Sequence, residues 1–265
     1  MKHLNTESKA KQIYFLCAMP RSGNTLFTSL MNQNSDIAVT ANSITLEIMK
    51  ELFLLKKTDV FKNFPDEQSL NNVMDEVYNL YYKNWNQKII IDRGPICTPG
   101  NLMVMQKHFK QPIRCIVLVR DVLDVLASYI KWFETESTSF LNKYKTLEEK
   151  LNVVMHKNGA MAKELISIKY LLNHSDMAVF IKYDNLVQNP EHEIKKVYSF
   201  LNIPYYQHYF NNLNQVVVNG ISYNDTIVGN NMHTIKTDKI ISMDNSKYKN
   251  MIPEKFVREY GHITF

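Results

Sequence analysis

A short segment near the amino terminus has the composition of an anion-binding turn. It reads Pro-Arg-Ser-Gly-Asn-Thr, starts at residue 20 and follows an apolar run at 13–18. Backbone N–H groups at the start of a helix lack partners inside the helix, so they can bind a phosphate-type anion. Gly23 lets the backbone approach such a ligand closely. Further donors are the side chains of Arg21, Ser22 and Thr25.

Two observations limit what this turn can bind. It lacks the Gly-Lys pair of a Walker A loop, G-x-x-x-x-G-K-[ST]. There is also no obvious Asp to hold Mg²⁺, which argues against an ordinary ATPase or kinase. A plain turn with a serine cap is the structural alternative. Its place between a strand-like run and a helical pattern favours the anion site.

A second pair of polar residues follows the strongest apolar run of the chain, 113–119. Arg120 ends this run, and Ser128 lies eight positions later on an otherwise apolar helical stripe. Ligands of open α/β sheets bind beyond the carboxyl ends of the strands, so we expect Arg120 at the ligand edge. The structural alternatives are a surface ion pair for Arg120 and a hydroxyl bonded back to its own helix for Ser128.

The elements that must position these residues alternate along the chain. Strands are expected at residues 13–18, 88–92, 113–119 and 177–182. Helical patterns cover residues 24–32, 45–56, 67–84, 99–109, 122–130, 147–172 with a break near Gly159, and 189–202. After residue 204 we expect irregular chain, with a possible strand at 216–218. This order predicts an α/β fold of three layers, in which helices flank a central, mostly parallel sheet.

Composition narrows the class of protein. The 265 residues carry a formal charge of +5, spread without a basic stripe, so we expect no nucleic-acid partner. No run approaches the roughly 20 apolar residues of a membrane span. The three cysteines lack CxxC spacing, which predicts buried free thiols rather than a disulfide framework or a zinc site. We expect one cytoplasmic domain over residues 1–265.

Three segments in order resemble the family of sulfotransferases that use 3′-phosphoadenosine 5′-phosphosulfate (PAPS). Residues 20–26, PRSGNTL, are similar to the family's 5′-phosphosulfate loop, P-[KR]-S-G-[TS]-T. Residues 119–129 resemble its 3′-phosphate element, in which Arg and Ser stand eight apart. Tyr183-Asp184-Asn185-Leu186, with Asn-Pro at 189–190, resembles its YEDL…NP segment. The likeness covers roughly residues 13–205 and is nearest to the bacterial, phage-type and tyrosylprotein branches.

The resemblance implies a P-loop-like fold, PAPS as donor, PAP as product and no required metal. It assigns the 5′-phosphosulfate to Arg21, Ser22, Gly23, Asn24, Thr25 and Leu26, and the 3′-phosphate to Arg120 and Ser128. Tyr183 would lie near the nucleotide. Asn24 departs from the family's Thr or Ser, which changes the side-chain donor but leaves the backbone N–H.

Transfer would be in line, with Arg21 stabilising charge on the leaving phosphate and a general base taking the acceptor proton. The candidates for the base are Asp92 at the end of a strand, Glu47 on a helix and His233 in the tail. An ion pair with Arg93 is the structural alternative for Asp92. Lys236, next to His233, could contact phosphate if the tail closes over the nucleotide.

Small-molecule, saccharide, lipid and peptide hydroxyls or amines all fit as acceptors. Two other functions stay open at this stage. A P-loop nucleotide kinase or NTPase would prefer Mg-ATP to PAPS. A non-catalytic PAP-binding module would keep Arg120 and nucleotide binding but would not turn over.

Overall fold

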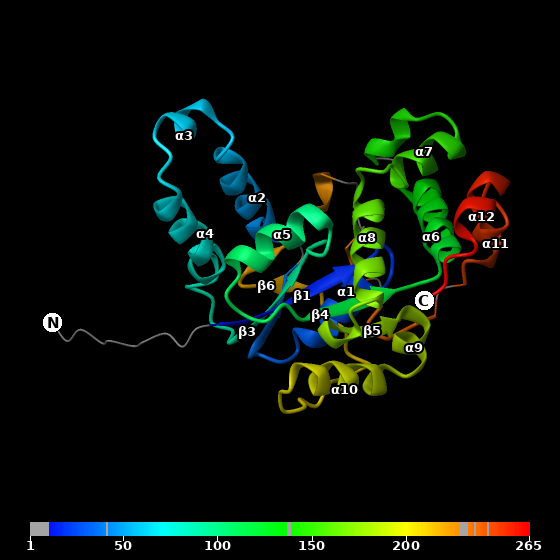
Figure 1. The fold of residues 1–265 in the computed structure, drawn as a ribbon. Coiled ribbons are helices and arrows are strands. Elements are labelled where there is room, and N and C mark those ends of the chain that lie inside the picture. The colour runs from blue at the N-terminus through cyan, green and yellow to red at the C-terminus, as the bar shows by residue number, and fades with distance from the viewer. Residues whose placement is uncertain (1–10, 41, 137–138, 228–232, 236, 243) are drawn as a thin grey trace.

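The computed structural model describes residues 11–265 except residues 41, 137–138, 228–232, 236 and 243. Its centre is a five-stranded sheet in the order β2–β3–β1–β4–β5, and every neighbouring pair is parallel (Figure 1). The strands are β1 (Gln12–Ala18), β2 (Ile37–Val39), β3 (Ile89–Arg93), β4 (Cys115–Val119) and β5 (Ala178–Lys182). The expected parallel sheet is confirmed. Strand β2 was not expected, because three residues are too few to show a pattern.

The helices cover both faces of this sheet. In the first half of the chain they are α1 (Asn24–Met31), α2 (Thr45–Leu55), α3 (Asp59–Asn63), α4 (Glu67–Tyr81), α5 (Pro99–His108) and α6 (Val122–Thr135). In the second half they are α7 (Leu147–Val154), α8 (Ala160–Leu172), α9 (Tyr183–Gln188), α10 (Pro190–Leu201), α11 (Ser246–Lys249) and α12 (Glu254–Tyr260). The long helical region at 147–172 is thus two helices, with the break at the expected Gly159.

Strand β1 shows how the sequence builds three layers. Its side chains alternate between the two faces, as in any strand. Phe15 and Cys17 join one buried cluster with residues of α5, α6 and α8. Tyr14 and Leu16 join the other cluster, with residues of α1 and α10. Both faces are therefore buried, which explains the continuous apolar run and confirms the three-layer prediction.

The tail after residue 204 is more ordered than expected. It holds the hairpin β6 (Val217–Val218) and β7 (Ile221–Ser222), a 3₁₀ turn at Asp225–Ile227, and the helices α11 and α12. Helix α11 packs on α6, and the Phe256 side chain of α12 is buried in the same core. The expectation of irregular chain is wrong for these helices, because tertiary packing rather than local periodicity stabilises such short elements.

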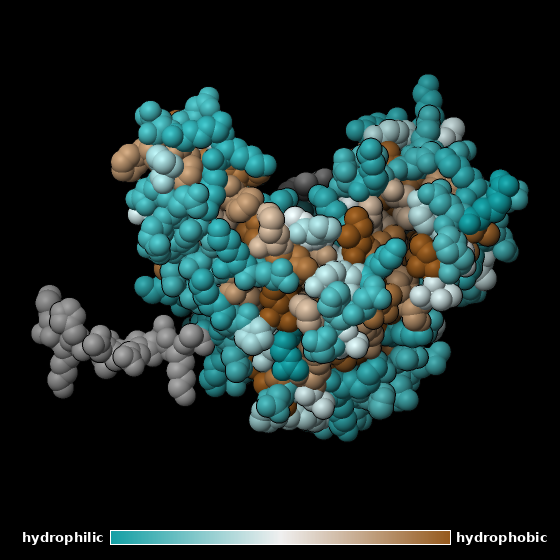
Figure 2. All heavy atoms as spheres, viewed as in Figure 1, coloured by the Kyte–Doolittle hydropathy of each residue, from teal (hydrophilic) through white to brown (hydrophobic). Residues whose placement is uncertain are grey.

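Two helical projections stand apart on the upper side of the molecule in the view of Figure 1. Helices α2, α3 and α4 form one, and α6, α7, α11 and α12 form the other (Figure 1). Figure 2 shows the surface hollowed between them. Within the described part of the chain, no helix combines the length and the apolar character needed to cross a bilayer.

Candidate active site

The turn between β1 and α1 is held by its own side chains. The Ser22 hydroxyl donates to the Met19 carbonyl at 2.6 Å, and the Asn24 amide donates to the same oxygen at 2.9 Å. Arg21 and Gly23 adopt positive φ angles of 65° and 92°. The Ser22 backbone N–H also donates to the Met19 carbonyl, at 3.3 Å. Ser22 and Asn24 therefore fasten the turn, and the Asn24 backbone N–H at the start of α1 is what this pair can offer a ligand.

Helix α1 begins without a cap. Gly23 occupies the N-cap position and has no side chain to accept a capping hydrogen bond, and the first turn holds no acidic residue. Thr25 and Leu26 follow in the first turn, and both side chains are partly exposed. Uncapped N–H groups at the positive end of a helix form a site for an anion.

Gly23 is required by a close neighbour as well as by its backbone angle. A Cβ atom at this position would lie 2.9 Å from Cδ2 of Tyr183, which begins α9 at the end of β5. The other neighbour of that ring is Arg120, whose guanidinium carbon lies 4.0 Å from the ring centroid. Glycine, tyrosine and arginine from three strand ends thus pack as one stack.

Arg120 and Ser128 also contact the turn directly. Arg120 donates from a terminal guanidinium nitrogen to the Arg21 carbonyl at 3.1 Å. The Arg21 side chain donates from Nε to the Ser128 hydroxyl, also at 3.1 Å. Arg120 is 8% exposed, and its own Nε has no hydrogen-bond partner among the described residues. A buried guanidinium with an unmet donor suits an anionic ligand.

The electrostatics of the turn agree with this reading. Burial lowers the pKa of Arg21, and the neighbouring charge of Arg120 lowers it further, whereas the phenol of Tyr129 raises it. Two guanidinium groups are therefore held together at a buried place, where like charges repel. A bound anion would relieve this repulsion.

Asp92 lies at the end of β3 inside a cage of hydroxyl groups. Its oxygens accept hydrogen bonds from Thr40 at 2.8 Å, Ser43 at 2.9 Å and Thr45 at 2.6 Å. Burial raises its pKa, although these donors act in the opposite direction. The carboxyl group thus ties the segment that leads into α2 to the sheet.

The other two expected bases lie in different surroundings. Glu47 is exposed on the first turn of α2. His233 is partly buried in the tail, where its Nδ1 lies 2.5 Å from an Asp225 carboxylate oxygen. Its ring stacks on Tyr223 with the centroids 4.2 Å apart. Lys236 lies outside the described residues.

The tail places His233 where two arginine charges affect its imidazole. Burial lowers the pKa of His233, the Asp225 carboxylate raises it, and the charges of Arg93 and Arg21 lower it. Both arginines therefore lie within electrostatic reach of the imidazole. A hollow of about 610 Å³ adjoins the pair and is lined by Gln215, Ser222, Tyr223, Asn224, Asp225, Thr226 and Thr234.

Three residues of this site were not singled out as functional from the sequence. Asp225 and Tyr223 stand in a segment without periodicity, eight and ten positions before His233. The sequence suggested Arg93 only as an ion-pair partner of Asp92. Successive strand residues point to opposite faces of a sheet, so the two side chains of this strand diverge. The dipeptide Asp92-Arg93 at a strand end was the one available signal for Arg93.

The α/β protein has a parallel sheet, with an uncapped turn after β1 and a buried arginine after β4. Both lie at the carboxyl edge, where open α/β sheets bind ligands. The chain belongs to the Sulfotransferase domain family, whose family model matches residues 11–255. It is therefore a transferase of that family, and the expected resemblance is confirmed.

Two solved structures illustrate the likeness in fold. The "Sulfotransferase Domain from the Curacin Biosynthetic Pathway" aligns with a TM-score of 0.50 at 18% identity, over 97% of this chain and 92% of that one. The "Sulfotransferase Domain from the Synechococcus PCC 7002 Olefin Synthase" gives 0.52 at 13% identity, over 91% and 94%. A comparison with curated protein sequences found no significant match. The two structural alignments confirm the expected P-loop-like fold.

Proposed function

We propose that this protein transfers a sulfuryl group from PAPS to a hydroxyl or amine acceptor and releases PAP. The observation that carries the proposal is the buried Arg120, which is stacked on Tyr183 and bonded to the turn, and whose Nε has no hydrogen-bond partner in the described part of the chain. Its guanidinium donates to the Arg21 carbonyl, and the Arg21 side chain donates to Ser128, so the residues proposed for two anionic groups are neighbours. PAPS carries two such groups, at its 3′ and 5′ positions.

The turn residues would hold the 5′-phosphosulfate. The backbone N–H groups of the uncapped start of α1 follow Arg21 in the turn, and the Arg21 guanidinium donates to the Ser128 hydroxyl. In an in-line transfer, charge develops on the leaving phosphate, and preorganised donors in a buried place stabilise it strongly. These groups are all supplied by the chain, so the proposed reaction requires no metal.

We assign the general base to His233. Its Nδ1 is engaged by Asp225, which leaves Nε2 to accept the acceptor proton, and its pKa is lowered, so the neutral form persists near neutral pH. Asp92 is assigned a positioning role, because both of its oxygens already accept hydroxyl hydrogen bonds.

The choice between these bases can be measured. His233→Asn should lower turnover roughly 10²–10⁴-fold, the usual contribution of a general base. Asp92→Asn keeps the shape of its side chain and should lower turnover less, with PAP affinity unchanged. A larger loss in Asp92→Asn, or in Glu47→Gln, would move the assignment to that residue.

The acceptor is proposed only as a class. Small molecules, saccharides, lipids and peptides with a free hydroxyl or amine fit a hollow that opens beside Asp225 and Tyr223. We treat residues 1–265 as one domain that supplies donor and acceptor sites together, with Lys236 available to the nucleotide phosphates.

The first test is calorimetric titration with PAP, with Mg-ATP as the comparison ligand. We expect tight binding of PAP and weak binding of Mg-ATP. Arg120→Ala should weaken PAP binding by about 2–3 kcal/mol, or roughly 30- to 150-fold, the scale of a charge-assisted contact. Equal binding of both nucleotides would favour a kinase or NTPase. PAP binding without release of PAP from PAPS across an acceptor panel would indicate a non-catalytic module.

The chain offers a matched control at the other end of β4. Arg114 lies 4.3 Å from the ring centroid of Phe200 and donates to the Phe200 carbonyl, so its packing mirrors that of Arg120. Arg114→Ala should keep the PAP affinity of the unmodified protein. Equal losses in both variants would mean that general destabilisation, and not a phosphate contact, explains the effect of Arg120→Ala.

A further inference from the structure

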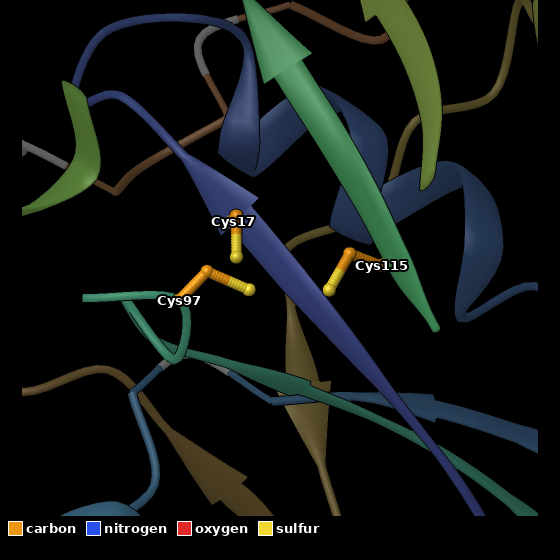
Figure 3. Close-up of side chains that lie close together, drawn as sticks. All are labelled: Cys17, Cys97 and Cys115. Atoms are coloured by element: carbon orange, nitrogen blue, oxygen red, sulfur yellow. The ribbon is translucent and has the colours of Figure 1, made fainter. Parts of the chain in front are cut away.

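The three cysteines of the chain form one cluster beneath the site. They come from β1, from the loop between β3 and α5, and from β4, and they are Cys17, Cys97 and Cys115. Each is at most 1% exposed, and their sulfur atoms all lie within 4.8 Å of one another. Figure 3 shows the three sulfurs pointing into a common space.

The sheet itself brings two of these thiols together. Phe15 of β1 is the register partner of Cys115, so Cys17 lies two positions further along the neighbouring strand. Both cysteines point to the same face, because both belong to the cluster that packs under α5, α6 and α8. The loop after β3 then places Cys97 over them. Residues far apart in the sequence thus supply three sulfur ligands to one point.

The ligand set selects the chemistry of the ion. Thiolates prefer soft cations such as Cu(I) and Zn²⁺. Structural zinc sites are almost always four-coordinate, and open zinc sites complete that number with water. Within the described part of the chain, this group contains three ligands and no His, Asp or Glu, and it is closed to solvent. A closed set of three sulfurs suits a three-coordinate ion better than zinc.

The spacing agrees with such an ion. A metal bound to three sulfurs at about 2.3 Å lies in a triangle with edges of about 4 Å. The observed upper limit of 4.8 Å requires only small side-chain movements to reach this triangle. The Cys17 thiol donates to the Gly94 carbonyl at 3.5 Å, a weak bond that a metal–sulfur bond can replace.

We propose that these three cysteines bind one Cu(I) ion in three-coordinate geometry. Each cysteine is four or five positions from an arginine at the carboxyl edge, in the pairs Cys17 and Arg21, Cys97 and Arg93, and Cys115 and Arg120. The ion would join β1, β4 and the β3–α5 loop just below these arginines. A ligand that binds only the folded state stabilises that state. Loading should therefore raise the melting temperature.

The test is an anaerobic titration of the purified full-length chain with Cu(I) against the chromogenic chelator bicinchoninate. Because the chain has only three cysteines, a Cu(I)–thiolate absorption band can arise only from this cluster. We expect one equivalent of Cu(I), the thiolate band and a higher melting temperature. Removing a residue that only hydrogen-bonds to a metal ligand weakens metal binding about 10–100-fold. Cys97 would be a ligand itself, so Cys97→Ala should weaken Cu(I) binding at least about 100-fold.

Met105→Leu is the matched control, because it removes a fully buried sulfur from the same core and should bind Cu(I) as the unmodified protein does. Melting of each metal-free variant checks that it is folded, and Cys97→Ser replaces Cys97→Ala if the latter is not. Two results would overturn the proposal. One is complete loss of Cu(I) to the chelator without a thiolate band in the unmodified protein. The other is equal affinity in the Cys97 variant.

Discussion

Replacing Gly23 by alanine tests the stack that joins the turn to Tyr183 and Arg120, the proposed nucleotide contacts. The residue has a φ of 92°, in the left-handed region that disfavours a side chain. The added Cβ would lie 2.9 Å from Cδ2 of Tyr183, closer than non-bonded carbons approach. The ring cannot simply turn away, because Arg120 packs against it at 4.0 Å. The substitution must therefore strain the backbone and move Tyr183.

The two effects give the size of the change. An alanine in the left-handed region costs roughly 1–2 kcal/mol. Moving a packed ring by a few tenths of an ångström adds about 1–3 kcal/mol, the usual cost of overpacking. We therefore expect Gly23→Ala to lower the free energy of unfolding by about 2–5 kcal/mol. Where the variant is folded, PAP affinity should also fall, because Arg120 moves with the ring.

Urea unfolding measures the first quantity, and calorimetric titration with PAP of the folded variant measures the second. Gly100→Ala is the matched control, because a Cβ there meets nothing within 4 Å and the residue lies in the first turn of α5. That change should be neutral or stabilising by roughly 0.5–1 kcal/mol. If Gly23→Ala matched Gly100→Ala in stability and PAP affinity, the stack described here would not be the support of the site.

Two further predictions concern the carboxylates of the site. Because the pKa of His233 is lowered from its usual 6.5, kcat/KM should stay high at pH 6.5 and fall only as the pH drops through that lowered value. Asp225→Asn removes the charge that opposes this shift, so the acid limb should move to still lower pH while kcat decreases; an unmoved limb would exclude His233 as the titrating base. Asp92→Ala leaves three hydroxyl donors without their acceptor and should cost about 3 kcal/mol in urea unfolding, at about 1 kcal/mol for each hydrogen bond. Asp176→Ala, at an exposed position, is its control, and equal stability of the two variants would remove the anchoring role of Asp92.

The core of the fold could be predicted because its signals are local. Continuous apolar runs mark β1 and β4, and the turn after β1 carries its own glycine and uncapped helix start. Parallel strands then place their carboxyl ends at one edge, which is why Arg21, Arg120 and Tyr183 could be expected together. Their contacts in the structure agree with that expectation.

Other features depended on packing and left no local signal. Helices α11 and α12 are short, and their stability comes from contact with α6 and the core. The Asp225–His233 pair joins two positions of the tail that no periodicity links.

The sequence by itself determined the class of fold, the turn proposed to bind an anion and the arginine after the strongest strand, since each depends on neighbours along the chain. Only the tertiary structure decided which polar groups meet. In the structure, Ser22 bonds to the Met19 carbonyl and Asp92 accepts from Thr40, so both side chains stabilise the local fold. His233 pairs with Asp225. The tertiary structure also gathered Cys17, Cys97 and Cys115 at one point. These pairings are mostly long-range contacts, and the packing of the whole core determines which residues form them.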